Sequence, residues 1–264
     1  MARVIGVFDS GFGGLTVLRE LRKALPGADY LYFGDTAHLP YGAKSVRTVA
    51  KYAIASAQFL EQQGITMLVI ACNTATALAL GDIRAAVKIP VIGVIEPGAE
   101  RAAEISKARR AAVIATEATV ASHAYLRALE SRGLQATERA CPLFVPLVEE
   151  GWVEHPVTER VAHIYIDEIL RDGARDADVL LLGCTHYPLI RPLLRRVAPA
   201  HIEIVDSAES TAAKVLHLLG ADRSESSPGS LRCYATDSVE KFRRLGEKFL
   251  GHPIESIDLV DIEK

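Results

Sequence analysis

The sequence lacks the features that mark exported, membrane and nucleic-acid-binding proteins. No apolar run is long enough to cross a membrane, and no hydrophobic leader with a small-residue cleavage site stands before the first apolar segment, residues 3–8. Lysine and arginine form no run with interleaved aromatic residues, and the formal net charge is −3. We therefore expect a cytoplasmic protein with neither a membrane nor a nucleic acid as its partner.

Signals for common cofactors are also missing. The segment at residues 9–14 (DSGFGG) is rich in glycine but matches neither the dinucleotide-binding pattern nor the P-loop. The four cysteines form no Cys-x-x-Cys pair, and no group of His, Cys, Asp or Glu has metal-ligand spacing. A cytosolic setting argues against structural disulfides. We expect no metal, no nucleotide and no disulfide.

What is present is a globular composition with alternating strand and helix patterns. The chain has 264 residues, of which 49% are hydrophobic and 24% charged, so it can form a large core in one or two domains. Helical patterns, such as the stripe within residues 45–63, separate short segments rich in Val, Ile and Leu. These segments have the composition of strands buried on both faces of a parallel sheet. The predicted strands lie at residues 3–9, 30–34, 67–71, 91–95, 111–116, 179–183, 202–206 and 231–235. The pattern predicts an α/β fold with mainly parallel sheets.

A weak internal repeat indicates two related halves. Residues 5–9 resemble residues 112–116, and residues 67–72 resemble residues 178–184. We expect a first α/β domain over residues 1–97 and 208–264 and a second over residues 98–207. Ligands in such sheets bind beyond the carboxyl ends of strands, and often between domains. We therefore expect the site in the cleft between the two domains.

Two segments of the same design carry the chemistry. Residues 69–75 (VIACNTA) and 181–187 (LLGCTHY) each read as a buried strand that stops at a cysteine, Cys72 or Cys184. One thiol on either side of a carbon suits a proton that leaves one face and returns to the other. A reach of about 3–3.5 Å from each sulfur to the carbon implies sulfurs roughly 7 Å apart. We expect Asn73 or Thr74 to cap the helix over residues 75–86, whose N-terminus would lower the pKa of Cys72 from about 8.5 toward neutrality.

Other polar residues near these segments have candidate supporting roles. His186 follows Cys184 and could exchange a proton with a thiol, and Pro188 is placed to open a helix. Asp9 could orient a substrate ammonium group or modulate a thiol. Residues 34–42 (GDTAHLPYG) form either a binding loop or a plain connection. The remaining cysteines, at positions 141 and 233, lack a strand-end setting of this kind, and we interpret them as structural.

Four motifs in this order resemble the glutamate racemase family of the Asp/Glu racemase superfamily. They are FDSGxGG at residues 8–14, GDTxxxPYG at 34–42, ACNTA at 71–75 and GCTHYP at 183–188. The similarity covers nearly the whole chain and includes PLVE at residues 146–149. The portion after about residue 221 matches least, and no site residue is taken from it.

The resemblance implies a cofactor-independent isomerase with two pseudo-symmetric α/β domains. It would interconvert L- and D-glutamate, supply D-glutamate for peptidoglycan synthesis, cell wall biogenesis and cell shape, and form a homodimer. Cys72 would deprotonate D-glutamate and Cys184 L-glutamate, with Asp9, Glu149 and His186 as supporting catalytic residues. The positions that match substrate-binding residues are Asp9, Ser10, Pro40, Tyr41, Gly42, Asn73, Thr74, Thr116, Thr119, Thr185 and His186.

Three other interpretations remain open at the level of sequence. The chain could be a two-cysteine racemase acting on aspartate or a hydantoin. It could be an amino-acid-binding protein, because two α/β lobes and a cleft fit that function without paired thiols. It could also be a redox protein that joins Cys72 and Cys184 in a disulfide, although their separate strand-end settings argue against this.

Overall fold

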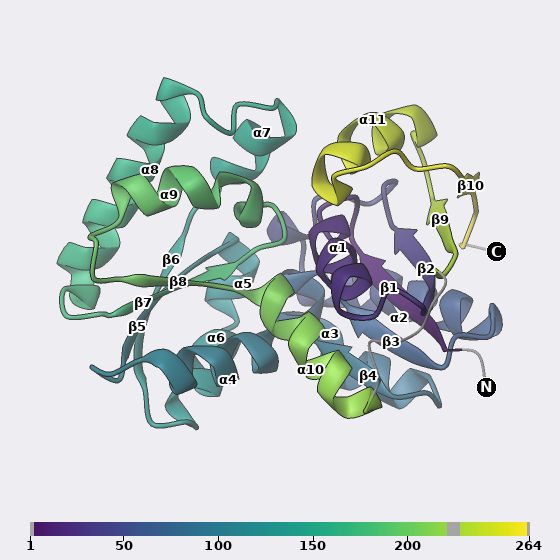
Figure 1. The fold of residues 1–264 in the computed structure, drawn as a ribbon, viewed down its shortest axis with the longest axis horizontal. Helices are drawn as coiled ribbons and strands as arrows, with labels where there is room; N and C mark the ends of the chain where they lie inside the picture. Colours follow the sequence, from purple (N-terminus) through teal and green to yellow (C-terminus); the bar gives the residue numbers. More distant parts are fainter. Residues whose placement is uncertain (1–2, 221–227, 263–264) are drawn as a thin grey trace.

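The computed structural model describes residues 3–220 and 228–262, which form two parallel sheets (Figure 1). The six-stranded sheet has the order β10-β9-β2-β1-β3-β4 and the four-stranded sheet the order β6-β5-β7-β8. All the strand pairs in both sheets are parallel. The strands are β1 (Val4–Asp9), β2 (Asp29–Gly34), β3 (Met67–Ile70), β4 (Val91–Gly93), β5 (Arg110–Ala115), β6 (Gln135–Ala140), β7 (Val179–Gly183), β8 (Glu203–Asp206), β9 (Leu231–Ala235) and β10 (Ile257–Leu259). The predicted α/β class is confirmed.

The two sheets repeat one arrangement of strands. The order β2-β1-β3-β4 in the first corresponds to β6-β5-β7-β8 in the second. The segments that resemble each other in sequence are the central strands, β1 with β5 and β3 with β7. Each sheet therefore has a switch point beside its first strand, which is where ligands bind in open α/β sheets.

Helices cover both faces of the six-stranded sheet because its central strands are apolar on both sides. Val7 packs on one face and Phe8 on the other, in two separate hydrophobic clusters. The helices of the first face are α1 (Leu15–Ala24), α10 (Ser207–Leu219) and α11 (Val239–Leu250), and those of the second are α2 (Val46–Gln62) and α3 (Asn73–Ala86). The central strands therefore lack polar alternation because both of their faces are buried, as expected for parallel sheets.

The four-stranded sheet is covered in the same way. The helices on one face are α7 (Phe144–Glu149), α8 (Pro156–Ile169) and α9 (Arg191–Val197), and those on the other are α4 (Ile95–Ile105) and α6 (Ala124–Glu130). The short elements are α5 (Glu117–Ala121), the 3₁₀ turns η1 (Tyr41–Ala43) and η3 (Tyr187–Ile190), and the π turn η2 (Leu170–Ala174). One hydrophobic cluster contains residues of both sheets, so the two halves share a core.

The structure corrects several sequence predictions. The strand expected over residues 91–95 ends at Gly93, and α4 begins at Ile95 because Pro97 lies in its first turn, where a missing N–H costs little. The boundary expected between residues 97 and 98 therefore falls inside a helix. Strands β6 and β10 were not predicted, because both are edge strands with mixed polar sequences and no apolar run.

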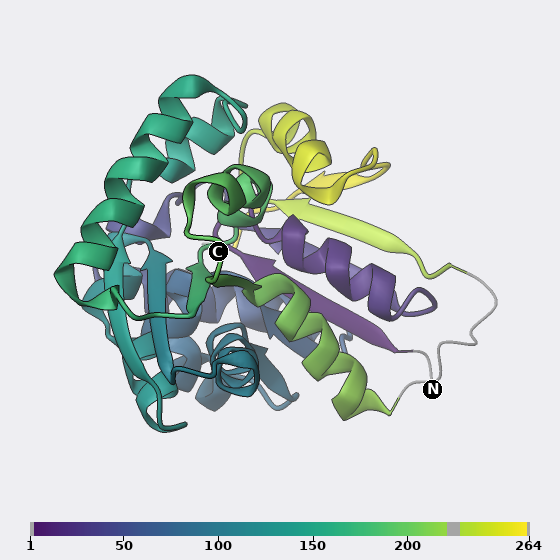
Figure 2. The same cartoon turned by 60° about the vertical axis from the view of Figure 1, so that its left-hand side comes forward.

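Helices α1 and α10 lie side by side where the two halves meet (Figure 2).

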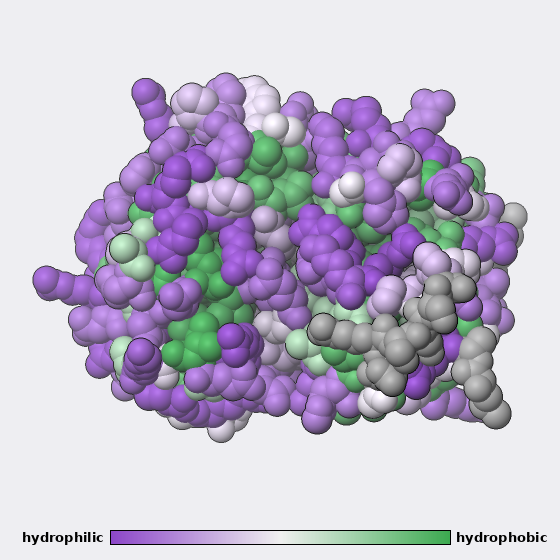
Figure 3. All heavy atoms as spheres, in the orientation of Figure 1, coloured by the Kyte–Doolittle hydropathy of each residue, from purple (hydrophilic) through white to green (hydrophobic). Residues whose placement is uncertain are grey.

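None of the helices within residues 3–220 and 228–262 is both long and apolar enough to pass through a lipid bilayer. The face shown in Figure 3 is mainly hydrophilic, with its larger hydrophobic areas over the half that holds the four-stranded sheet.

Candidate active site

A cavity lies where the carboxyl ends of strands from both sheets meet. Its volume is about 160 Å³, comparable with a cavity of about 150 Å³ that holds benzene. Eleven of the residues predicted for the site line it: Ser10, Pro40, Tyr41, Gly42, Cys72, Asn73, Thr74, Thr116, Cys184, Thr185 and His186. Cys72 follows β3 and Cys184 follows β7, so corresponding strands of the two sheets deliver the two thiols to one space.

Cys72 is itself the N-cap of α3, which corrects the prediction that Asn73 or Thr74 caps this helix. Its Sγ accepts a hydrogen bond from the Ala75 N–H at 3.4 Å and donates one to the Ser10 hydroxyl at 3.6 Å. Burial, together with the nearby Asp9 carboxylate, raises the pKa of Cys72 to about 12. The expected shift toward neutrality is therefore wrong, because desolvation of the thiolate outweighs the contact with the helix N-terminus.

We expect this pKa to be visible in the alkylation of Cys72 by iodoacetamide. Only the thiolate reacts, so the rate should rise by about tenfold per pH unit through the neutral and mildly alkaline range. The measurement uses the Cys184→Ser variant. Among the described residues that line the cavity, this variant keeps one cysteine, Cys72. Mass spectrometry of the modified peptide gives the rate. A rate that levels off near pH 7 would contradict the raised pKa.

Cys184 lies at the start of a chain of charged groups. Its Sγ is 3.9 Å from His186 Nδ1, and His186 Nε2 is 3.4 Å from Glu149 Oε1, within ion-pair range but without the alignment of a hydrogen bond. Lys241 Nζ lies 3.6 Å from the other Glu149 oxygen. Burial alone would lower the pKa of His186, but its contacts with Cys184 and Glu149 raise it to about 10. These contacts favour the protonated form of the imidazole.

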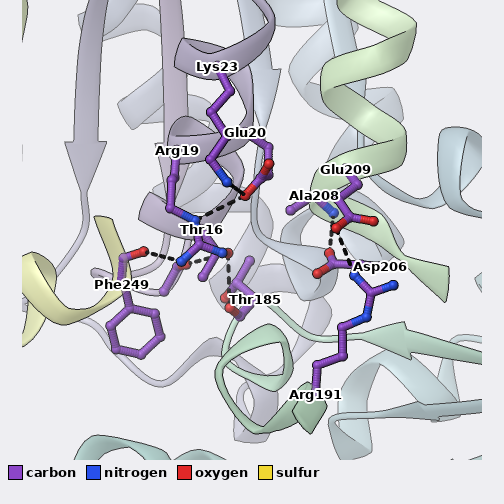
Figure 4. A network of polar contacts seen from close by, with 11 residues as sticks. Thr16, Arg19, Glu20, Lys23, Thr185, Arg191, Asp206, Ala208, Glu209 and Phe249 are labelled. Atoms are coloured by element: carbon purple, nitrogen blue, oxygen red, sulfur yellow. Dashed lines mark hydrogen bonds and ion pairs between the residues drawn. The ribbon is translucent and has the colours of Figure 1, made fainter. Parts of the chain in front are cut away.

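The segment after Cys184 is anchored to the first half of the chain. Pro188 opens the 3₁₀ turn η3 rather than an α-helix, and α9 follows it. The Thr16 hydroxyl on α1 donates to the Thr185 carbonyl oxygen at 3.0 Å. Figure 4 shows this bond beside the Arg19 side chain, which donates to the Phe249 carbonyl oxygen of α11. The Cys184 segment is thus held by helices that pack on the other sheet.

Three threonine hydroxyls form a small network at the cavity. Thr74 Oγ1 lies 3.0 Å from Thr116 Oγ1 and 3.2 Å from Thr119 Oγ1, and the last two are 2.9 Å apart. Thr74 and Thr116 line the cavity, whereas Thr119 is fully buried behind them. Thr74 follows β3 and Thr116 follows β5, so this network also joins the two halves.

The loop at residues 34–42 belongs to the site, which resolves the alternatives left open by its sequence. The buried Asp35 carboxylate accepts a hydrogen bond from the Tyr41 hydroxyl at 2.6 Å and from Thr236 Oγ1 at 2.9 Å, and its Oδ1 lies 2.8 Å from His38 Nδ1. Tyr41 in turn lines the cavity. Sequence reasoning did not select Asp35, and no site residue was taken from the C-terminal portion that supplies Thr236.

Asp9 and Glu149 do not line the cavity but stand behind residues that do. Asp9 Oδ2 accepts a hydrogen bond from the Gly11 N–H at 2.9 Å, while Oδ1 is buried with no hydrogen-bond partner within residues 3–220 and 228–262. Burial raises the pKa of Asp9, although His186 and three backbone amides oppose the shift. For Glu149, burial would raise the pKa, but contacts with His186 and Lys241 lower it.

Five lining residues were not among the predicted site residues: Ala43, Glu117, Pro142, Val145 and Pro146. Three of them follow β6, the strand that lacked an apolar signal. The two cysteines interpreted as structural are buried and lie outside this lining.

Comparison with known proteins first gives the class. The Asp/Glu/Hydantoin racemase family model matches residues 5–215. The chain therefore belongs to this family, and the two thiols in one cavity accord with an amino-acid racemase.

More similar proteins give the particular group. Glutamate racemase from Koribacter versatilis (strain Ellin345) is 56% identical over 283 residues, covering 98% of this chain and 97% of the relative. The crystal structure of a glutamate racemase isoform from Bacillus anthracis has a TM-score of 0.91 at 35% identity and covers 98% of this chain and 97% of that one. Glutamate racemase from Francisella tularensis, solved with D-glutamate, has a TM-score of 0.90 at 35% identity and covers 99% and 98%. Within its family the chain belongs to the glutamate racemases, which confirms the resemblance seen in the sequence motifs.

Proposed function

We propose that this chain interconverts L- and D-glutamate without a cofactor and supplies D-glutamate for peptidoglycan synthesis. The observation that carries the proposal is the placement of Cys72 and Cys184 in one cavity, each at the end of the corresponding strand in one of two similar sheets. One cysteine removes the Cα proton as a thiolate, and the other donates a proton to the opposite face as a thiol. After each turnover the protonation states of the two sulfurs have been exchanged.

The difficult step is the removal of a weakly acidic proton beside a carboxylate. The segments after the two cysteines contain no lysine that would hold a pyridoxal group. Charge that grows on the substrate carboxylate must be stabilised by backbone amides, hydroxyls and amide side chains that are already in position. Such donors are available at the cavity from the backbone N-terminus of α3, from the Asn73 amide and from Thr185.

The two cysteines differ in their charged surroundings. The Asp9 carboxylate near Cys72 suits an interaction with the substrate ammonium group. A bound ammonium ion would offset the burial that raises the pKa values of both Cys72 and Asp9. On the other side, the His186 imidazolium, held by Glu149, stabilises negative charge on Cys184 or returns a proton to it. The resemblance to the family supplies the assignment that we propose, Cys72 to D-glutamate and Cys184 to L-glutamate.

The remaining assignments follow from the family and are proposals for this chain. Besides the Asp9 carboxylate, substrate contacts come from the predicted residues that line the cavity, with Thr119 holding Thr74 and Thr116 from behind. We propose the domain division 1–97 with 208–264 and 98–207, with its first boundary inside α4, because it assigns every strand to the domain of its own sheet.

We further propose that the chain acts in the cytoplasm as a homodimer. Four of its exposed large apolar side chains, Leu143, Trp152, Val157 and Ile164, lie within one stretch of the chain around α7 and α8. Exposed apolar surface of this kind favours association. Sedimentation analysis of the purified chain tests the dimer, and a monomer at micromolar concentration would contradict it.

Circular dichroism of glutamate incubated with the purified protein, with no cofactor added, tests the reaction. We expect the signal of either enantiomer to decay to zero, because the two have equal free energy and racemisation ends at equal amounts. In deuterium oxide the product should carry deuterium at Cα, since both thiols exchange with solvent. L-Aspartate serves as the comparison substrate and should react far more slowly. A stable signal with L-glutamate, or turnover without deuterium in the product, would overturn the proposal.

A further inference from the structure

We propose that Tyr125 is a positioning residue for racemisation, which holds the Asn73 side chain so that its amide N–H groups face the substrate. The inference rests on the proposed function. It extends that function to a residue that does not line the cavity and was not among the predicted site residues. Tyr125 acts through Asn73, the residue next to Cys72.

The contact between the two side chains is short and fully enclosed. Tyr125 lies on α6 and has no exposed surface, and Asn73 is 3% exposed as the first residue of α3. The Tyr125 hydroxyl donates to Asn73 Oδ1 at 2.6 Å. Helix α6 packs on the four-stranded sheet and α3 on the six-stranded sheet, so the bond crosses from one half of the molecule to the other.

The geometry fixes which end of the amide faces Tyr125. A separation of 2.6 Å is typical of an O–H···O bond and short for an N–H···O bond, which places the amide oxygen toward the phenol. Burial raises the pKa of Tyr125 well above its usual value, so the hydroxyl keeps the proton that it donates.

This orientation leaves the other end of the amide for a ligand. Asn73 Nδ2 is buried and has no hydrogen-bond partner among the residues that the structure describes, yet Asn73 lines the cavity. A buried amide donor without a partner is unfavourable unless another molecule completes it. A substrate carboxylate has the acceptor oxygens for this donor, and its charge grows in the transition state. Tyr125 therefore keeps a donor aimed at the charge that the reaction creates.

The aromatic ring of Tyr125 also contacts the segment that carries the second cysteine. A Cβ atom at Gly183 would lie only 2.9 Å from Cε2 of this ring. Tyr125 therefore contacts a neighbour of each cysteine, Asn73 after Cys72 and Gly183 before Cys184. Phenylalanine at this position keeps the ring contact and removes only the hydroxyl, which separates the two contributions.

The test compares Tyr125→Phe with the unaltered chain in the dichroism assay. We expect kcat to fall by roughly tenfold with a smaller change in KM, because the oriented donor contributes most in the transition state. Tyr30→Phe is the matched control. Tyr30 is equally buried and its hydroxyl donates to backbone carbonyl oxygens of the α1 region, 2.9 and 3.0 Å away. This control should keep its kcat even if its thermal stability falls as much as that of Tyr125→Phe.

A double-mutant cycle with Asn73→Ala distinguishes positioning from packing. If Tyr125 acts through Asn73, Tyr125→Phe should have almost no further effect on kcat in the Asn73→Ala background. An equal loss of kcat in both backgrounds, or an unchanged kcat in Tyr125→Phe, would overturn the proposal. If the unaltered chain fails to racemise glutamate, the proposed function fails as well. If it racemises normally while Tyr125→Phe matches it, the inference about Tyr125 fails by itself.

Discussion

Replacing either Cys72 or Cys184 with serine should abolish racemisation, with a loss of at least about a thousandfold in kcat/KM. The reaction needs a base on one face of Cα and an acid on the other, so neither sulfur can substitute for its partner. A serine hydroxyl is far less acidic than a thiol and provides almost no anion at neutral pH. Cys72 and Cys184 are each 5% exposed, and serine is nearly isosteric with cysteine, so the fold should remain intact. The decay of the dichroism signal measures the loss.

Cys233→Ala is the control for this pair of variants. Cys233 is fully buried and lies outside the cavity lining, so its loss should affect stability and leave kcat/KM unchanged. A variant at either Cys72 or Cys184 that keeps near-normal turnover would exclude the two-base scheme.

Hydrogen exchange in the same variants assigns each cysteine to one face. The two enantiomers have equal free energy, so kcat/KM is equal in the two directions and cannot make the assignment. In Cys184→Ser, the remaining thiolate of Cys72 can still remove a proton and return a deuteron to the same face. We therefore expect slow deuterium uptake into D-glutamate, without inversion and without uptake into L-glutamate, and the reverse pattern in Cys72→Ser.

The parts of this site that sequence could predict are those carried by short motifs at strand ends. Cys72, Cys184 and Asp9 each follow an apolar run, and parallel topology brings such ends to one edge of a sheet. The related order of strands in the two sheets could be expected from the repeat in β1, β3, β5 and β7, because those strands are central and apolar.

The rest depends on contacts between segments far apart in sequence. Asp35 accepts hydrogen bonds from Tyr41 and from Thr236, which lies 201 positions further along the chain. In the sequence, Tyr125 looks like an ordinary core residue on an amphipathic helix. No residue near it in the sequence identifies Asn73 as its hydrogen-bond partner. The pKa of Cys72 was misjudged for the same reason, since the helix N-terminus is visible in the sequence while burial and the nearby Asp9 carboxylate are not.

Gly13→Ala should lower kcat/KM by about a hundredfold, although it adds a single methyl group outside the cavity lining. A Cβ atom at Gly13 would lie 2.7 Å from Cε1 and Nδ1 of the His186 imidazole and would also collide with the Thr185 hydroxyl. The imidazole has little freedom to yield, since the ring of Phe249 stands 5.0 Å from it and that of Phe12 6.1 Å.

The methyl group therefore displaces the cation beside Cys184, or separates the two halves of the molecule, since Gly13 follows β1 and His186 follows β7. Gly81→Ala is the matched control: it lies within α3, and a Cβ atom there meets nothing within 4 Å. It should keep full activity and raise the free energy of unfolding by about 0.5–1 kcal/mol, because alanine favours helix interiors. Dichroism assays and urea unfolding of both variants provide the comparison. Normal turnover in Gly13→Ala would show that the position of the His186 imidazole is not important for the reaction. The role proposed for the imidazolium at Cys184 would then be wrong.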